Sequence, residues 1–141
     1  MIYRQMVLVL LMFSANISAE EITVSGTDDI RMEISSQVSP IPLNQMHNWL
    51  ITLRTPTGTA LENALIRVDG GMPAHNHGLA TSPQVTDYLG EGRYLVEGLR
   101  FHMPGDWLMQ IQVEHNGRSY RAEAKFQLGT TLIQPFLNPQ N

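Results

Sequence analysis

Apolar and polar residues alternate with a period of two through much of the chain, which predicts β-strands. The clearest alternation lies at 107–114 and again at 120–128, on either side of Asn116-Gly117. An Asn-Gly pair favours the type I′ turn of a tight hairpin, because both central residues of that turn need a positive φ. We therefore expect these two segments to form a β-hairpin.

Shorter segments with similar alternation precede this hairpin. They lie at 31–38, 47–54, 64–68, 84–89 and 92–97, and a short apolar stretch at 22–24 is a candidate edge strand. Turn-forming residues separate them, and no stretch carries the apolar spacing of a helix. About seven short strands with frequent turns predict an all-β fold, a single immunoglobulin-like antiparallel β-sandwich.

The N-terminal residues have the pattern of a secretory signal peptide that is removed before folding. Arg4 lies in the first segment, an apolar run follows at 7–13, and small polar residues lead to a cleavage point after Ala19, with Ala15 as the second choice. The run is shorter than the roughly 20 residues of a membrane-spanning helix. We expect a periplasmic or secreted protein with a signal peptide (1–19), a polar segment (20–30), the sandwich domain (31–128) and a C-terminal tail (129–141).

Charge and cysteine content narrow the function further. The net charge is −4 and the nine lysines and arginines are scattered, which argues against a nucleic-acid partner. The chain has no cysteine, so disulfides, a thiolate nucleophile and cysteine-ligated zinc are excluded. An exported domain of this kind depends on its hydrophobic core for stability.

Potential metal ligands gather in the segment 68–83. Its glycines and prolines are too dense for a helix, so we expect a shaped loop between strands that presents Met72, His75 and His77. A second cluster at 101–107 repeats the same residue types around His102 and Met103. We expect the two loops to meet.

A metal site is the more specific of two interpretations of these residues. His75 and His77 are two apart, so in an extended stretch both rings lie on one side and can approach a single ion. Met72, His102 and Met103 are further candidate ligands. Thioethers suit Cu(I) and imidazoles suit Cu(II) and zinc, so a mixed set in an oxidising compartment favours copper.

A purely structural interpretation stands beside it. His75 and His77 could instead hydrogen-bond backbone carbonyls and hold the loop in shape. Met72 and Met103 could simply fill gaps under the loop, a common use of methionine. Under that interpretation the two loops carry no ligand.

Other polar and aromatic residues have simpler expectations. Asp69 and Asp106 are near enough in sequence to accept hydrogen bonds from histidine ring N–H groups. His47 is expected to pack beside a tryptophan, and His115, at a hairpin turn, to be solvated. Both tryptophans are expected to anchor the core, at positions Trp49 and Trp107.

Three stretches together resemble the FixH-like/YtkA-like domain family. They are His47-Asn48-Trp49, Gly70-Gly71-Met72-Pro73-Ala74-His75-Asn76-His77-Gly78-Leu79 and Phe101-His102-Met103-Pro104-Gly105-Asp106-Trp107. The resemblance covers roughly residues 44–115. It implies a small exported or membrane-tethered β-sandwich linked to copper handling and respiratory-oxidase assembly. The chain departs from FixH in carrying a cleavable signal instead of a membrane anchor, and His102 stands where the family also has other residues.

No enzyme motif is present, so we expect a protein without catalytic activity. The chain lacks the Gly-x-Ser-x-Gly, His-Glu-x-x-His and phosphate-loop patterns. A metal-dependent hydrolase or oxidase is a weaker alternative. The sequence predicts an exported copper-binding accessory or carrier protein. The alternative is a metal-free periplasmic domain that docks on a membrane respiratory or transport assembly through its loops or a sheet edge.

Overall fold

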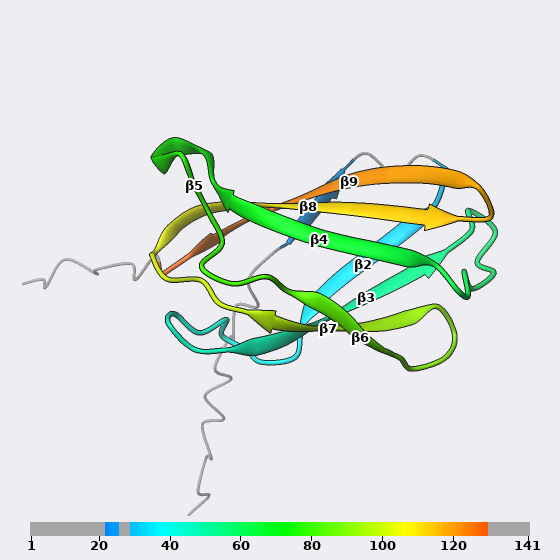
Figure 1. Cartoon of the computed structure of the whole chain (residues 1–141), viewed down its shortest axis with the longest axis horizontal. Helices are drawn as coiled ribbons and strands as arrows, with labels where there is room; N and C mark the ends of the chain where they lie inside the picture. Colours follow the sequence, from blue (N-terminus) through cyan, green and yellow to red (C-terminus); the bar gives the residue numbers. More distant parts are fainter. Residues whose placement is uncertain (1–21, 26–28, 130–141) are drawn as a thin grey trace, which may run out of the picture.

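The protein is a β-sandwich of two antiparallel sheets, as the alternation predicted (Figure 1). The computed structural model describes residues 22–25 and 29–129, so the proposed signal peptide and most of the tail lie outside it. One sheet has the order β1-β9-β8-β4-β5 and the other β2-β3-β7-β6. The strands are β1 Thr23–Ser25, β2 Arg31–Ser36, β3 His47–Arg54, β4 Leu65–Met72, β5 His77–Gly78, β6 Gln84–Tyr88, β7 Arg93–Leu99, β8 Gly105–His115 and β9 Arg118–Leu128. None of the described residues form a helix capable of crossing a membrane.

The predicted hairpin is the longest strand pair of the fold. β8 and β9 stay in register from Gly105↔Leu128 to His115↔Arg118. Asn116 and Gly117 have φ values of 49° and 74°, as a type I′ turn requires. This pairing places the start of β8 and the end of β9 at one end of the sandwich.

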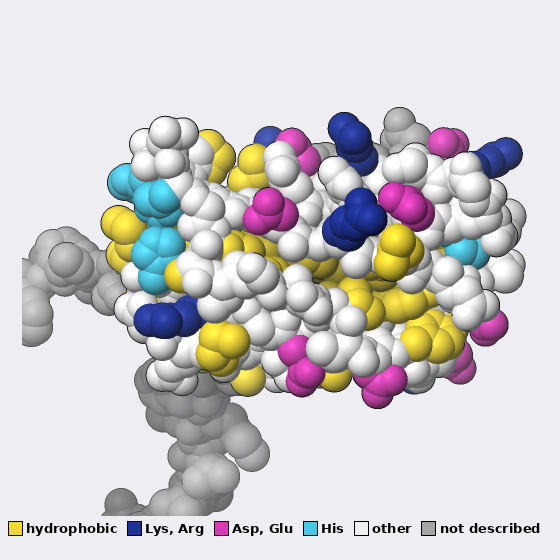
Figure 2. Space-filling model, viewed as in Figure 1, with side chains coloured by type: hydrophobic (Ala, Val, Ile, Leu, Met, Phe, Trp, Pro, Cys, Tyr) yellow, Lys and Arg dark blue, Asp and Glu magenta, His cyan; other side chains and the backbone are white. Residues whose placement is uncertain are grey.

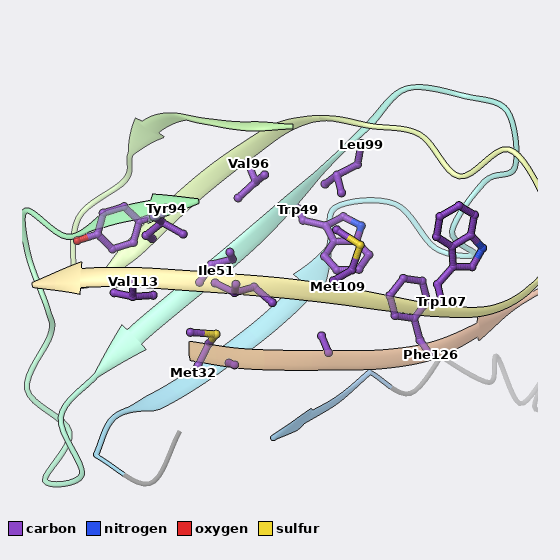
Figure 3. Close-up of a cluster of buried hydrophobic side chains, with 14 of the residues drawn as sticks. Met32, Trp49, Ile51, Tyr94, Val96, Leu99, Trp107, Met109, Val113 and Phe126 are labelled. Atoms are coloured by element: carbon purple, nitrogen blue, oxygen red, sulfur yellow. The ribbon is translucent and has the colours of Figure 1, made fainter. Parts of the chain in front are cut away.

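The inner faces of the two sheets form one apolar core (Figure 3). Trp49 and Trp107 are 2% and 1% exposed, which confirms both as core anchors. Phe101 joins them, with ring centroids 5.7 Å from Trp49 and 4.9 Å from Trp107. The aromatic cluster lies toward the end of the sandwich at which β8 begins, so it also supports the loops at that end.

β4 is longer than the sequence predicted. We expected a strand at 64–68 followed by a loop, but β4 continues through Gly70 and Gly71 to Met72. A Cβ atom at Gly70 would lie 2.4 Å from the sulfur of Met109, and one at Gly71 would lie 2.4 Å from the carbonyl oxygen of His77. The glycine pair therefore permits close packing inside a sheet and does not form a turn.

The sandwich also begins earlier than residue 31. β1 lies within the segment 20–30 and pairs with β9, from Thr23↔Lys125 to Ser25↔Glu123. Ile30 is 3% exposed and belongs to the core. The candidate edge strand at 22–24, inside the polar segment, is therefore confirmed as part of the sheet, displaced by one residue.

Candidate functional site

A tight turn at the end of β4 carries two of the predicted site residues. A 3₁₀ turn, η1 (Pro73–His75), follows β4, and Asn76 adopts the left-handed conformation with φ 52°. The chain then returns as β5, in which His77 pairs with Met72 of β4. This reversal places His75 on the turn and His77 on the strand that follows it.

The second loop connects β7 to β8 and is held by the core. Phe101 is 0% exposed, and its carbonyl oxygen accepts a hydrogen bond of 2.8 Å from the Asn44 N–H. The indole N–H of Trp107 donates to the Met103 carbonyl oxygen at 3.0 Å. His102 lies between these two anchored points, so the core determines where its ring can stand.

The two loops meet, and three imidazoles form a row. The ring centroids of His75 and His77 are 5.7 Å apart, and those of His77 and His102 are 4.8 Å apart. Figure 2 shows histidine side chains gathered at the end of the sandwich that bears the β4–β5 turn. We call these three residues the histidine row; His75 is exposed, whereas His77 and His102 are half-buried.

Trp107 forms a wall behind the inner part of the row. Its ring stands edge-on to His77, with centroids 6.3 Å apart, and to His102, at 5.6 Å. The sequence identified Trp107 only as a core residue. Its second contact could not be found from the sequence, because it depends on where β5 and the β7–β8 loop lie in space.

Two ring nitrogens in the row are buried without a hydrogen-bond partner. They are Nε2 of His77 and Nδ1 of His102. Nδ1 of His77 lies 3.4 Å from the Gly78 carbonyl oxygen, which can only accept. In the neutral tautomer that donates to this oxygen, Nδ1 carries the proton and Nε2 keeps its lone pair. Burying a polar atom without a partner costs about 1–3 kcal/mol, so each of these nitrogens calls for a partner such as a water molecule or an ion.

The spacing of the row is compatible with shared metal ligation. Two imidazoles that ligate one ion at about 2.0 Å have ring centroids roughly 4.5 to 6.3 Å apart, depending on the angle at the metal. Both separations in the row fall in this range. Within the described ranges, however, no three side chains among His, Cys, Asp and Glu are grouped so that all could hold one ion. The row therefore offers pairs of imidazoles and not a three-histidine cage.

Both candidate methionines adjoin residues of the row along the backbone, and both pack into the core. Met72 is 1% exposed and directly opposite His77 in the β4–β5 pair. Its methyl group lies 2.8 Å from the position that a Cβ atom would occupy at Gly105. Met103 is half-buried against the core and follows His102 in the chain. The packing role weighed in the sequence analysis therefore holds for both residues.

The two aspartates do not support the histidine rings. Asp69 accepts a hydrogen bond of 2.7 Å from the Gly70 N–H, and Asp106 is exposed. Neither carboxylate bonds a histidine ring within the part of the chain that the structure describes. His47 packs against aromatic rings as expected, with its centroid 6.5 Å from Trp49 and 5.3 Å from that of Phe101.

Hollows flank the η1 turn on two sides. One has a volume of about 320 Å³ and includes Met72, Asn76 and His77 in its lining. The other, of about 620 Å³, is lined by Pro73 and Ala74 of η1 together with residues of β8 and β9 that include Trp107 and Phe126. The turn that carries His75 therefore protrudes between them.

A comparison with known protein families matches residues 25–112 to the family model described as YtkA-like. The match spans more than half of the chain and includes the β4–β5 turn and the β7–β8 loop. No curated protein and no solved structure matches the chain.

Proposed function

The chain belongs to the YtkA-like family, and from this premise we propose that it is an exported copper-binding accessory or carrier protein. Its site is the histidine row of His75, His77 and His102, with the thioethers of Met72 and Met103 beside it. The export signal is the pattern at 1–19, and the place of action is the periplasm or the cell exterior.

One observation carries this proposal. Nε2 of His77 and Nδ1 of His102 are buried and have no hydrogen-bond partner, on rings 4.8 Å apart. A bound ion would accept both lone pairs and remove the cost of burying them. Trp107 excludes water from the inner side of the pair, so the ion would be held against an apolar wall.

The residues favour copper over other metals. Imidazole groups form the row, and two methionines adjoin it along the backbone, Met72 opposite His77 and Met103 next to His102; imidazole and thioether ligands together suit copper in either oxidation state. The chain has no cysteine for a structural zinc site, and neither nearby aspartate hydrogen-bonds a ring of the row among the described residues. A site of uncharged ligands without an activated nucleophile supports a protein that binds and releases the ion.

Metal titration of the purified protein tests the proposal. We expect one equivalent of copper to bind, with zinc binding much more weakly. His77→Ala combined with His102→Ala should lower copper affinity by at least about 100-fold, since even residues that only orient ligands change affinity by 10–100-fold. His115→Ala is the matched control, because His115 lies at the far end of β8. Copper binding unchanged by the double substitution would contradict the proposal.

The alternative of a metal-free docking domain is favoured by a different feature. β5 pairs with Gly71 and Met72 of β4, and the Leu79 N–H donates to the Gly70 carbonyl oxygen, so residues 65–69 of β4 form an open edge of the described sheet. Such an edge can accept a strand from a partner. A protein that takes up no copper but pulls down a membrane respiratory or transport complex, with or without its histidine row, would support this alternative.

A further inference from the structure

The three histidines of the row differ in exposure and in orientation. His75 is exposed on the η1 turn, whereas the inner nitrogens of His77 and His102 have no contact with solvent. The planes of His75 and His77 are 23° apart in a stacked arrangement, and those of His77 and His102 are tilted by 44°. The row is therefore not a set of equivalent ligands.

Burial separates a holding pair from an outer ring. His77 and His102 each carry a ring nitrogen that is buried without a hydrogen-bond partner, whereas His75 is exposed. The ring centroids of His77 and His102 are 4.8 Å apart, within the range for two imidazoles on one ion. This pair is the better holding site, and His75 is left with another task.

Burial of the pair creates a problem of access. Nitrogens that are closed off from solvent are not in direct reach of an ion in solution, so an exposed neighbouring ligand that receives the ion first would give it a route. His75 is the exposed imidazole of the row and is in ring contact with His77. Among the described residues its ring makes no hydrogen bond, and it stands on a protruding turn whose residues 73–76 are all exposed.

We infer that the row works in two stages: His77 and His102 hold the copper ion, and His75 is the exposed imidazole through which the ion enters and leaves. The inference rests on the proposed function and assigns separate tasks within its site. The partner is any donor or acceptor that presents copper ligands at the η1 turn.

The exchange step needs only ligand substitution. An unprotonated ring nitrogen of His75 donates its lone pair to the incoming ion as one bond from the donor's ligand to the ion breaks. A nitrogen of the inner pair then replaces the next donor ligand. The ion keeps its oxidation state and no electron is transferred. Release follows the same steps in reverse, with the acceptor's ligand displacing His102 or His77.

Transfer kinetics from the copper-loaded protein to a chelator test the inference. The chelator is bathocuproine disulfonate for Cu(I) or EDTA for Cu(II), whichever state binds. We expect His75→Ala to slow transfer about tenfold or more, and to lower the equilibrium affinity much less than His102→Ala does. His102→Ala should lose affinity, because it removes half of the holding pair. His115→Ala, remote from the row, should match the unsubstituted protein in both measurements.

A rescue variant separates a ligand role from a structural one. His75→Met replaces the imidazole by a thioether, which also binds Cu(I), and should recover most of the Cu(I) transfer rate. The inference is overturned if His75→Ala weakens affinity as much as His102→Ala, or if it transfers copper at the unsubstituted rate. If the unsubstituted protein takes up no copper at all, the proposed function itself fails and the inference falls with it.

Discussion

At the scale of single residues, the histidines show that one residue type occupies very different environments in this fold. His47 is 5% exposed and its ring packs among aromatic rings of the core. His77 and His102 are half-buried beside Trp107 and keep unpartnered nitrogens. His75 is exposed on a turn. Residue type alone did not separate these roles, because each depends on neighbours that are distant in sequence.

Tyr94 provides a prediction that is independent of metal. Its hydroxyl donates to the Leu61 carbonyl oxygen at 2.6 Å and accepts from the Ala64 N–H at 3.0 Å. Burial raises the pKa of Tyr94 above its usual value of 10.0. Since the unfolded chain ionises first, the free energy of unfolding should fall as the pH rises above about 10.

Tyr94→Phe should lower the stability of the domain at neutral pH and reduce its loss of stability at alkaline pH. Loss of the two hydrogen bonds should lower the free energy of unfolding by about 1–3 kcal/mol at neutral pH. The alkaline decline should become shallower, as measured by urea unfolding at pH 7 to 11. Tyr120→Phe is the control, because its hydroxyl makes no hydrogen bond among the described residues. An equally steep decline in Tyr94→Phe would exclude Tyr94 as its cause.

At the scale of elements, the unit formed by β4, η1 and β5 determines the site. The glycines of β4 let β5 approach its end, and Asn76 reverses the chain in the left-handed region. Only glycine, asparagine and aspartate enter that region readily, because a Cβ atom clashes with the backbone there. The reversal is what brings His77 next to His102.

A substitution at Asn76 should therefore affect the row without touching a ligand. Asn76→Val places a β-branched residue in a left-handed conformation and should destabilise the turn by about 1–2 kcal/mol. We expect weaker copper binding because His77 is no longer held beside His102. Asn76→Gly tolerates the same backbone and should bind copper normally. Isothermal titration of both variants makes the comparison, and equal loss in both would point to the asparagine side chain instead.

At the scale of the whole molecule, the sandwich places its loops at two ends with different character. The histidine row lies where β4 ends and β8 begins, and the β8–β9 turn lies at the opposite end (Figure 1). The rigid pairing of β8 with β9 connects the two ends. Because the row rests on Trp107 at the core, binding at the row should be coupled to the stability of the entire domain.

Copper should therefore raise the melting temperature of the protein. A ligand present at 100 times its dissociation constant adds about 2.7 kcal/mol to the free energy of unfolding. For a domain of this size that corresponds to a shift of roughly 10–20 °C. Calorimetry with and without copper measures it, and the double substitution of His77 and His102 should abolish it. A shift of the same size in the double variant would place the bound ion elsewhere.

The sequence by itself determined the class of the fold and the residues of interest. Alternation fixes which side chains of β8 and β9 face the core, and Asn116-Gly117 sets their turn, because both signals act over a few residues. The concentration of histidine and methionine at 68–83 and 101–107 identified the two segments that meet. These inferences succeeded because local patterns encode local structure.

Only the tertiary structure decided how the candidate ligands are arranged. The sequence grouped His75, His77 and His102, and the structure separates them by exposure: His75 is exposed, whereas His77 and His102 are half-buried with ring centroids 4.8 Å apart. The sequence also did not reveal that β4 continues through Gly70 and Gly71. A glycine pair is locally typical of a turn, whereas here it permits close packing against residues that are distant in sequence. Contacts between loops depend on how two sheets pack, and no local pattern in the chain specifies that packing.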